Sequence, residues 1–191
     1  MSENSVHRPP HLPGETGVWV FILGDMLMFA AFFIVFMAYR SEDVALYVNS
    51  QHTLNQHFGA LNTFLMLTSS WCVAVAVEAG RADHRQRAQT WLVAAMGCAL
   101  CFVGVKFFEY SEKIAAGFTL TTNDFFMYYF MLTGLHLMHV LLGLGVLCYL
   151  WFSLRAAPSA ASMRTLESGA SFWHMVDILW IVLFALLYLL R

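Results

Sequence analysis

The chain has 191 residues, of which 60% are hydrophobic and 12% charged, and its formal net charge is −2. Together with a mean hydropathy of +0.65, this composition excludes an ordinary soluble domain and is typical of a protein that crosses the membrane several times. We expect no nucleic-acid partner.

The first 16 residues form a polar arm rich in proline and glycine, and residues 17–191 are expected to form a single transmembrane domain. About 20 apolar residues in a helix cross the roughly 30 Å hydrocarbon layer. Long apolar runs without apolar/polar alternation indicate helices rather than a barrel. The sequence therefore predicts an all-α, polytopic membrane bundle of five transmembrane helices, near residues 17–39, 60–79, 91–110, 125–152 and 173–190.

The basic residues predict an orientation, because cytoplasmic loops carry an excess of Lys and Arg. With the N-terminus inside, six basic residues lie on the inner side and three on the outer side. The inner set is Arg8, Arg81, Arg85, Arg87, Arg155 and Arg164, and the outer set is Arg40, Lys113 and Arg191. This bias predicts an N-in/C-out protein.

Asp25 lies inside the first apolar segment, about 12 Å from its start. An ionisable side chain at this depth is costly, so it marks a functional or structural site. Phe29, Phe32 and Phe36 share its helix face. Asp25 acts either as a proton-relay carboxylate or as a hydrogen-bonded acid that joins two helices, and the absence of a second acid at this depth of its helix favours the structural role.

Lys106 and Glu109 are three residues apart near the outer end of the third segment, and Tyr110 follows them. Lys106 either extends towards lipid head groups or pairs with Glu109. We expect Lys106 to be an interfacial anchor, and the more specific alternative is a binding site for a lipid head group.

His136 and His139 lie on one face of the fourth segment. Interhelical hydrogen bonds to Asp25, Asp177 or Asn62 are the expected role, and Gly134, Gly143 and Gly145 leave room for close helix approach. The alternative is a bis-histidine haem that uses His136 or His139 with His174. His174 lies several ångström nearer the inner surface by helical rise, which makes this alternative unfavourable.

His174 and Asp177 lie near the start of the last segment, between Trp173 and Trp180. Trp173 is typical of the aromatic belt at the membrane interface, and Trp180 is grouped with it as an interface anchor. Asp177 either orients His174 or pairs with a neighbouring helix. Cys98 and Cys101 form a C-x-x-C pair without a second ligand pair, so we expect no metal site.

Five motifs in the same order resemble the cytochrome c oxidase subunit III family. They cover nearly the whole chain, and they are FILGDMLMFAAFF, ALNTFLMLTSS, VKFFEYSEK, FMLTGLHLMHVLLGLG and SFWHMVDILW. The resemblance implies that Asp25, Asn62, Glu109, His136, His139, His174 and Asp177 are the family's buried polar residues. Larger members have seven helices, and the five-helix form is most similar to the short accessory protein associated with bacterial nitric oxide reductase.

The resemblance implies a non-catalytic accessory subunit that binds no haem or metal itself. Its expected partner is the haem-containing catalytic subunit of a respiratory terminal reductase, either a nitric oxide reductase or a cytochrome oxidase, in the bacterial inner membrane. Phospholipid is the expected small-molecule ligand, although the two missing helices form one wall of the family's lipid cleft.

Overall fold

The computed structural model describes residues 16–156 and 160–190, and these ranges are helical apart from short connections. Five helices are long and apolar enough to cross a membrane, which confirms the predicted all-α fold class and number of spans. A sixth helix, α2, occupies part of the segment predicted as a loop. The elements are α1 (Thr16–Glu42), α2 (Val44–His52), α3 (Gln56–Arg81), α4 (Arg85–Ala115), α5 (Asp124–Ala156), α6 (Ala160–Phe184) and the π-helical turn η1 (Ala185–Leu189).

The helices extend beyond the predicted apolar segments. The last span begins at Met163 rather than near residue 173. Hydropathy detects only the part of a helix that meets hydrocarbon, whereas capped polar turns continue the helix into the interface. Asn55 accepts a hydrogen bond from the His57 amide at the start of α3, and Asp43 does the same for Leu46 in α2.

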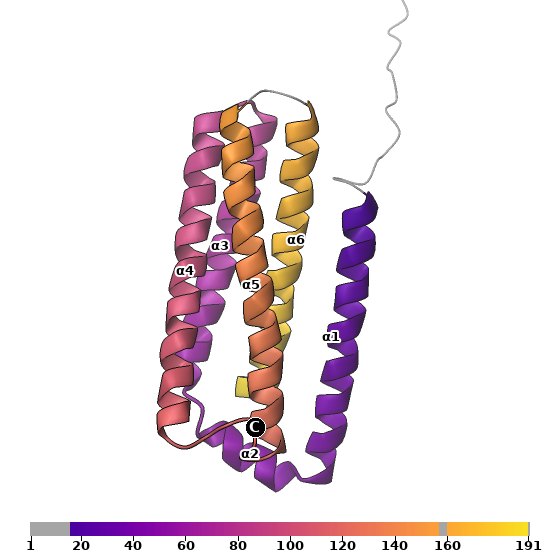
Figure 1. Ribbon diagram of the computed structural model, residues 1–191, viewed down its shortest axis with the longest axis vertical. Coiled ribbons are helices and arrows are strands. Elements are labelled where there is room, and N and C mark those ends of the chain that lie inside the picture. Colours follow the sequence, from indigo (N-terminus) through magenta and orange to yellow (C-terminus); the bar gives the residue numbers. More distant parts are fainter. Residues whose placement is uncertain (1–15, 157–159, 191) are drawn as a thin grey trace, which may run out of the picture.

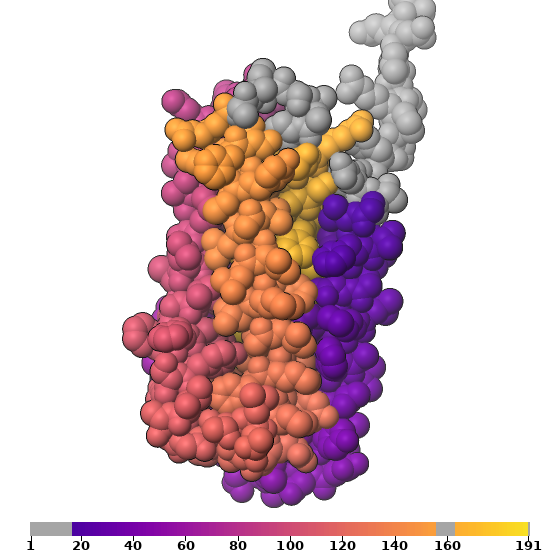
Figure 2. All heavy atoms as spheres, viewed as in Figure 1, coloured from indigo at the N-terminus to yellow at the C-terminus, as the bar shows by residue number. Residues whose placement is uncertain are grey.

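Helices α3, α4, α5 and α6 form a bundle in which α3 packs on α4 and α6, and α5 packs on α4 and α6. Figure 1 shows α1 standing beside this bundle, next to α5 and α6. The short helix α2 crosses one end, close to the C-terminus and the α4–α5 connection, while the α3–α4 turn lies at the other end. In Figure 2, α1 covers one flank of the molecule.

The last turn of the chain is held by side chains from other helices. Arg40 donates to the carbonyl of Leu190 over 3.0 Å, and Gln51 donates to that of Leu186 over 2.9 Å. Gln56 donates to the carbonyl of Tyr188 over 2.8 Å. Carbonyls at a helix end lack partners within the helix, so these bonds fix η1 against α1, α2 and α3 and place Tyr188 inside the bundle.

Four glycines in the described residues allow close packing in the bundle, among them Gly59 and Gly143. A Cβ added at Gly143 would lie 2.7 Å from the ring of Trp173, and one at Gly59 would lie 2.8 Å from Phe184. Gly134 and Gly145 have nothing within 4 Å of an added Cβ. The expectation of close approach is therefore confirmed at Gly143 and wrong at the other two positions.

In the region between α1 and α3, α2 buries the ring of Tyr47 against Phe36 and Phe125. Burial, with a smaller contribution from Asp124, raises the pKa of Tyr47 above its ordinary value. The Tyr47 hydroxyl therefore stays neutral at physiological pH.

Candidate functional site

Asp25 and His139 join α1 to α5. His139 Nε2 lies 3.1 Å from Asp25 Oδ1 and 3.0 Å from Oδ2, and both side chains are buried. His139 Nδ1 lies 2.8 Å from the Leu135 carbonyl, which can only accept, so Nδ1 carries a hydrogen. Nε2 therefore either accepts a proton from a neutral carboxyl or donates one to a carboxylate. In both cases a single proton lies between the two side chains.

The rest of the α1 face supports this pair. Ile22, Phe29 and Phe36 are buried and recur every three to seven residues around Asp25, which is the spacing of one helix face. The ring of Phe29 meets His139 edge-on at 5.5 Å between centroids. The prediction that the histidine helix contacts the helix bearing Asp25 is confirmed.

A second buried cluster joins α4 to η1. Lys106 Nζ lies 2.8 Å from Glu109 Oε2 and 3.0 Å from the hydroxyl of Tyr188, which donates to Glu109 Oε1. The Lys106 and Glu109 side chains are 1% and 0% exposed. Burial of an ion pair is tolerated only when its remaining polar atoms are also satisfied, and Tyr188 supplies that third partner.

Aromatic rings surround the Lys106 ammonium group. Its Nζ lies 4.9 Å from the Trp180 ring centroid and between 5.2 and 5.6 Å from those of Tyr110, Tyr129 and Tyr188. Such distances are those of cation–π contacts. The prediction that Lys106 is an interfacial anchor is wrong, and its alternative, the pair with Glu109, is present.

The other predicted anchors are also inside the bundle. Trp173 and Trp180 are 0% exposed, so neither ring faces lipid or head groups as an interface anchor does, and the prediction of interface anchoring is wrong for both. Trp173 packs on Gly143, and Trp180 Nε1 donates to Thr63 over 3.1 Å. Tyr110 is half-buried and its hydroxyl lies 2.6 Å from that of Thr133. Sequence alone does not show whether an indole faces lipid or a neighbouring helix.

Polar pairs also follow the contact between α3 and α6. Arg81 forms an ion pair with Glu167 at 2.8 Å, and the hydroxyl of Ser70 lies 2.6 Å from His174 Nδ1. The Trp180–Thr63 bond continues this series at the far end. Thr63 belongs to the ALNTFLMLTSS motif, whereas Ser70 and Tyr188 were not identified from the sequence. The seven-residue spacing of Ser70 from Thr63 on α3 was the available signal.

Three predicted polar residues are buried with atoms that no other group in the described ranges satisfies. They are both amide atoms of Asn62, both ring nitrogens of His136, and Oδ1 of Asp177. His136 packs against Phe102 and Trp180 at 5.8 and 5.2 Å between centroids. The predicted interhelical bond is therefore confirmed for His139 and not found for His136.

His139 does not fit a bis-histidine haem. Both of its ring nitrogens are engaged, by Asp25 and by the Leu135 carbonyl, and one ring nitrogen of His174 is engaged by Ser70. Within residues 16–156 and 160–190, no three His, Cys, Asp or Glu side chains come together as a metal site would require. The polar pairs described above can hold helices together.

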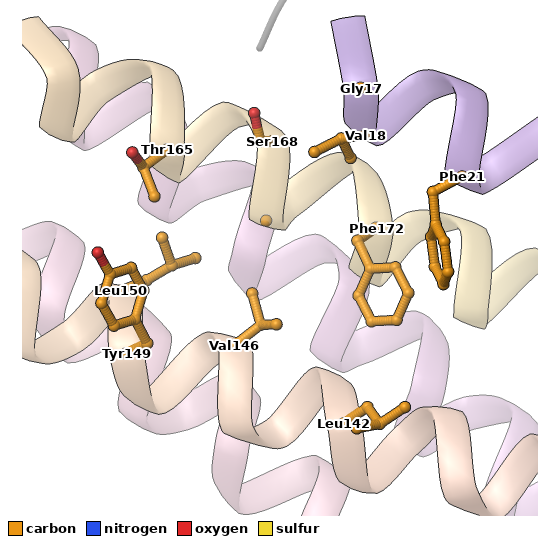
Figure 3. Close-up of a pocket in the computed structure, with 11 residues that line it drawn as sticks. Gly17, Val18, Phe21, Leu142, Val146, Tyr149, Leu150, Thr165, Ser168 and Phe172 are labelled. Carbon is orange, nitrogen blue, oxygen red and sulfur yellow. The ribbon is translucent and has the colours of Figure 1, made fainter. Parts of the chain in front are cut away.

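A groove of about 520 Å³ opens between α1, α5 and α6 near the start of α1. Figure 3 shows Val18 and Phe21 of α1 facing Phe172 of α6, with Leu142 and Val146 of α5 on the opposite wall. The lining is mainly apolar, and the exposed side chain of Tyr149 lies at the edge of the groove. Sequence reasoning did not find this groove, because its walls come from three helices that are far apart in the chain.

The family model described as cytochrome c oxidase subunit III matches residues 12–191. The chain belongs to the cytochrome c oxidase subunit III family. The match covers all five spans, including the buried acids Asp25, Glu109 and Asp177 and the three histidines predicted as site residues.

Relatives in bacteria and archaea agree with this assignment to the subunit III family. The chain is 33% identical over 199 residues to cytochrome c oxidase subunit 3 of Synechocystis, covering 98% of this chain and 83% of the relative. It is 29% identical to cytochrome bo(3) ubiquinol oxidase subunit 3 of Buchnera aphidicola, covering 91% and 84%. It is also 26% identical to heme-copper oxidase subunit I+III of Aeropyrum pernix, covering 92% of this chain and 22% of that protein.

Proposed function

We propose that this protein is a non-catalytic membrane accessory subunit of a haem–copper terminal oxidase, which supports the assembly and stability of the catalytic subunit and the lipid and proton environment around it. The family match over residues 12–191 carries this proposal. The geometry supports it, because the polar groups at bilayer depth mainly join one helix to another, as in Asp25–His139 and Glu109–Tyr188. Haem and metal then belong to the partner.

The proposed partner is the haem-containing catalytic subunit. The name of the Aeropyrum relative, heme-copper oxidase subunit I+III, supports this choice. Affinity purification from native membranes in mild detergent, followed by identification of the co-purifying subunits, tests it. A haem–copper oxidase subunit is the expected result. Recovery of nitric oxide reductase instead would support the finer prediction from the sequence, and recovery of neither would contradict the proposal.

An absorption spectrum separates this role from electron transfer by the chain itself. The chain purified away from its partner should show no intense Soret band, whereas a bis-histidine haem anchor would show one. A stoichiometric haem lost in a His139→Gln variant would overturn the accessory role.

We further propose that the groove between α1, α5 and α6 holds an acyl chain of a membrane phospholipid. The walls are apolar, the groove opens at the side of the bundle (Figure 3), and its volume suits part of a hydrocarbon chain. Val146→Trp fills the groove, and Met138→Trp, at a position that is 49% exposed on the same helix, is the matched control. We expect mass spectrometry to find less retained phospholipid in the first variant alone. Equal retention would contradict the proposal.

The proposed orientation places the α3–α4 turn in the cytoplasm and the C-terminus outside, within the bacterial inner membrane. The odd number of spans places the start of α1 and the C-terminal turn at opposite ends of the bundle (Figure 1). Asp83 is an exposed residue of the α3–α4 turn, so an Asp83→Cys variant reports its side. A membrane-impermeant thiol reagent should not label this variant in intact cells, and labelling from outside would reverse the orientation.

A further inference from the structure

Helix α6 carries a polar stripe on the side that faces α3. Its members are Glu167, Ser171, His174 and Asp177, separated by four, three and three residues. This spacing keeps side chains on one face of a helix. The contacts of Glu167 with Arg81 and of His174 with Ser70 show that the face meets α3. The stripe extends about 15 Å into the bundle from Glu167.

A groove of about 250 Å³ follows the first part of this stripe. Its walls are Ala74, Val77 and Arg81 of α3 and Glu167, Ser171 and His174 of α6. A water molecule takes up roughly 30 Å³ of liquid volume, so the groove has room for several. The Arg81 side chain at its mouth is 59% exposed, which places the opening at the aqueous end of the helices.

The groove ends at His174, three residues before a buried acid on α6. Asp177 is 5% exposed and does not itself line the groove, but its carboxyl group interacts with Ser70 and with His174, which does line it. Its Oδ1 atom has no hydrogen-bond partner in the described part of the chain. A buried polar atom without a partner costs about 1–3 kcal/mol, and water that enters along the stripe would satisfy it.

The buried aspartates share one feature and differ in another. Each has a carboxylate oxygen without a hydrogen-bond partner in the described residues, Oδ2 of Asp25 and Oδ1 of Asp177, but Asp25 also pairs with the ring nitrogen of His139. The charged and titratable groups on the approach to Asp177 are His174 on its own helix and the Arg81–Glu167 pair at the mouth. The lining alternates these polar groups with Ala74, Val77 and Ala170, whereas the lining of the groove between α1, α5 and α6 is mainly apolar.

We propose that the groove between α3 and α6 is a water-filled inlet through which the Asp177 carboxyl exchanges protons with the aqueous phase at the α3–α4 end. The carboxyl releases its proton to a water molecule in the inlet and regains one from water, with no net chemical change. His174 lines the inner end and, held by Ser70, orients that water. The inlet does not depend on which oxidase the subunit joins.

Cysteine accessibility tests the inlet, because only a thiolate in contact with water reacts with a charged methanethiosulfonate. Ser171→Cys places a thiol on the wall of the groove in a chain whose native cysteines are replaced by alanine. Gly145→Cys is the matched control: Gly145 is exposed on α5 with open space at its Cβ, and it lies level with Ser171 because Gly143 packs on Trp173. Both variants are assayed in the assembled complex.

We expect the thiol at position 171 to react about tenfold faster or more than the thiol at position 145. Adding Glu167→Ala, which opens the mouth, should increase the rate at position 171 and leave the rate at position 145 unchanged. If Ser171→Cys fails to assemble, Ala74→Cys on the opposite wall replaces it. Slow, equal rates at the groove and control positions would show that the groove is dry and overturn the proposal.

Discussion

Helix α1 and the four-helix bundle use buried polar residues in different ways. In the most apolar stretch of α1, 17% of the residues are buried, whereas in the most apolar stretch of the last span 56% of the residues are buried. Asp25 on α1 meets a single residue on a single neighbour, whereas Glu109 in the bundle is bonded to Lys106 and to Tyr188 from another element. The consequence of removing a buried acid therefore depends on how many groups it leaves without a partner.

The two ends of the bundle also differ in how firmly their helices are held together. At the α2 end, side chains of α1, α2 and α3 hold the carbonyls of the last turn. At the start of α1, the apolar groove separates the helices (Figure 3). Helix α1 is therefore fixed most firmly at the end near α2, and its first turns border the groove.

The largest effect is expected in the bundle. Glu109→Leu leaves the Lys106 ammonium group buried without its counter-ion, and breaking a buried ion pair in this way costs about 3–5 kcal/mol. The thermal stability and yield of the purified complex should fall sharply. The double variant Lys106→Met/Glu109→Leu removes both charges and should recover most of the loss. Full stability of the single variant would show that the pair is not essential to the bundle.

Packing between α5 and α6 gives the next largest effect. Gly143→Val inserts a side chain where a Cβ already lies 2.7 Å from Trp173, and overpacking of this kind costs about 1–3 kcal/mol. Gly145→Val, two residues away with nothing within 4 Å of its Cβ, is the control. Thermal unfolding should separate the two variants, and equal midpoints would contradict the close contact at Gly143.

A smaller and more local effect is expected on α1. Asp25→Leu leaves His139 Nε2 without its partner, at about 1–3 kcal/mol, whereas Asp25→Asn retains a hydrogen-bonding group. Complex yield and turnover of both variants should rank wild type, Asn, then Leu. Normal assembly of Asp25→Asn with turnover abolished would instead show that Asp25 handles protons, the alternative left open by the sequence.

The smallest effect concerns the mouth of the α3–α6 groove. Arg81 is largely exposed, and surface ion pairs contribute about 0–1 kcal/mol. Arg81→Gln should therefore change the unfolding midpoint little compared with Glu109→Leu. Destabilisation as large as that of Glu109→Leu would mean that the Arg81–Glu167 pair is buried in the assembled complex.

The sequence predicted the helical class, the five spans and most of the residues that lie at bilayer depth. It failed where the direction of a side chain decided the outcome. Lys106, Trp173 and Trp180 were assigned to the interface and lie inside the bundle, because an apolar segment looks the same from sequence whichever face meets lipid. Helix α2 was missed because its nine residues are too short and too polar to register as a span.

Length and hydropathy alone determined that this chain crosses a membrane five times, because a hydrogen-bonded helix of about 20 apolar residues is the stable solution in hydrocarbon. The spacing of Asp25, Phe29 and Phe36 also determined which face of α1 is buried. Only the tertiary structure decided that His139 rather than His136 meets Asp25, and that Tyr188 completes the Lys106–Glu109 pair. Those partners lie 114 and 79 residues apart in sequence, and the rotation of each helix about its axis selects between them.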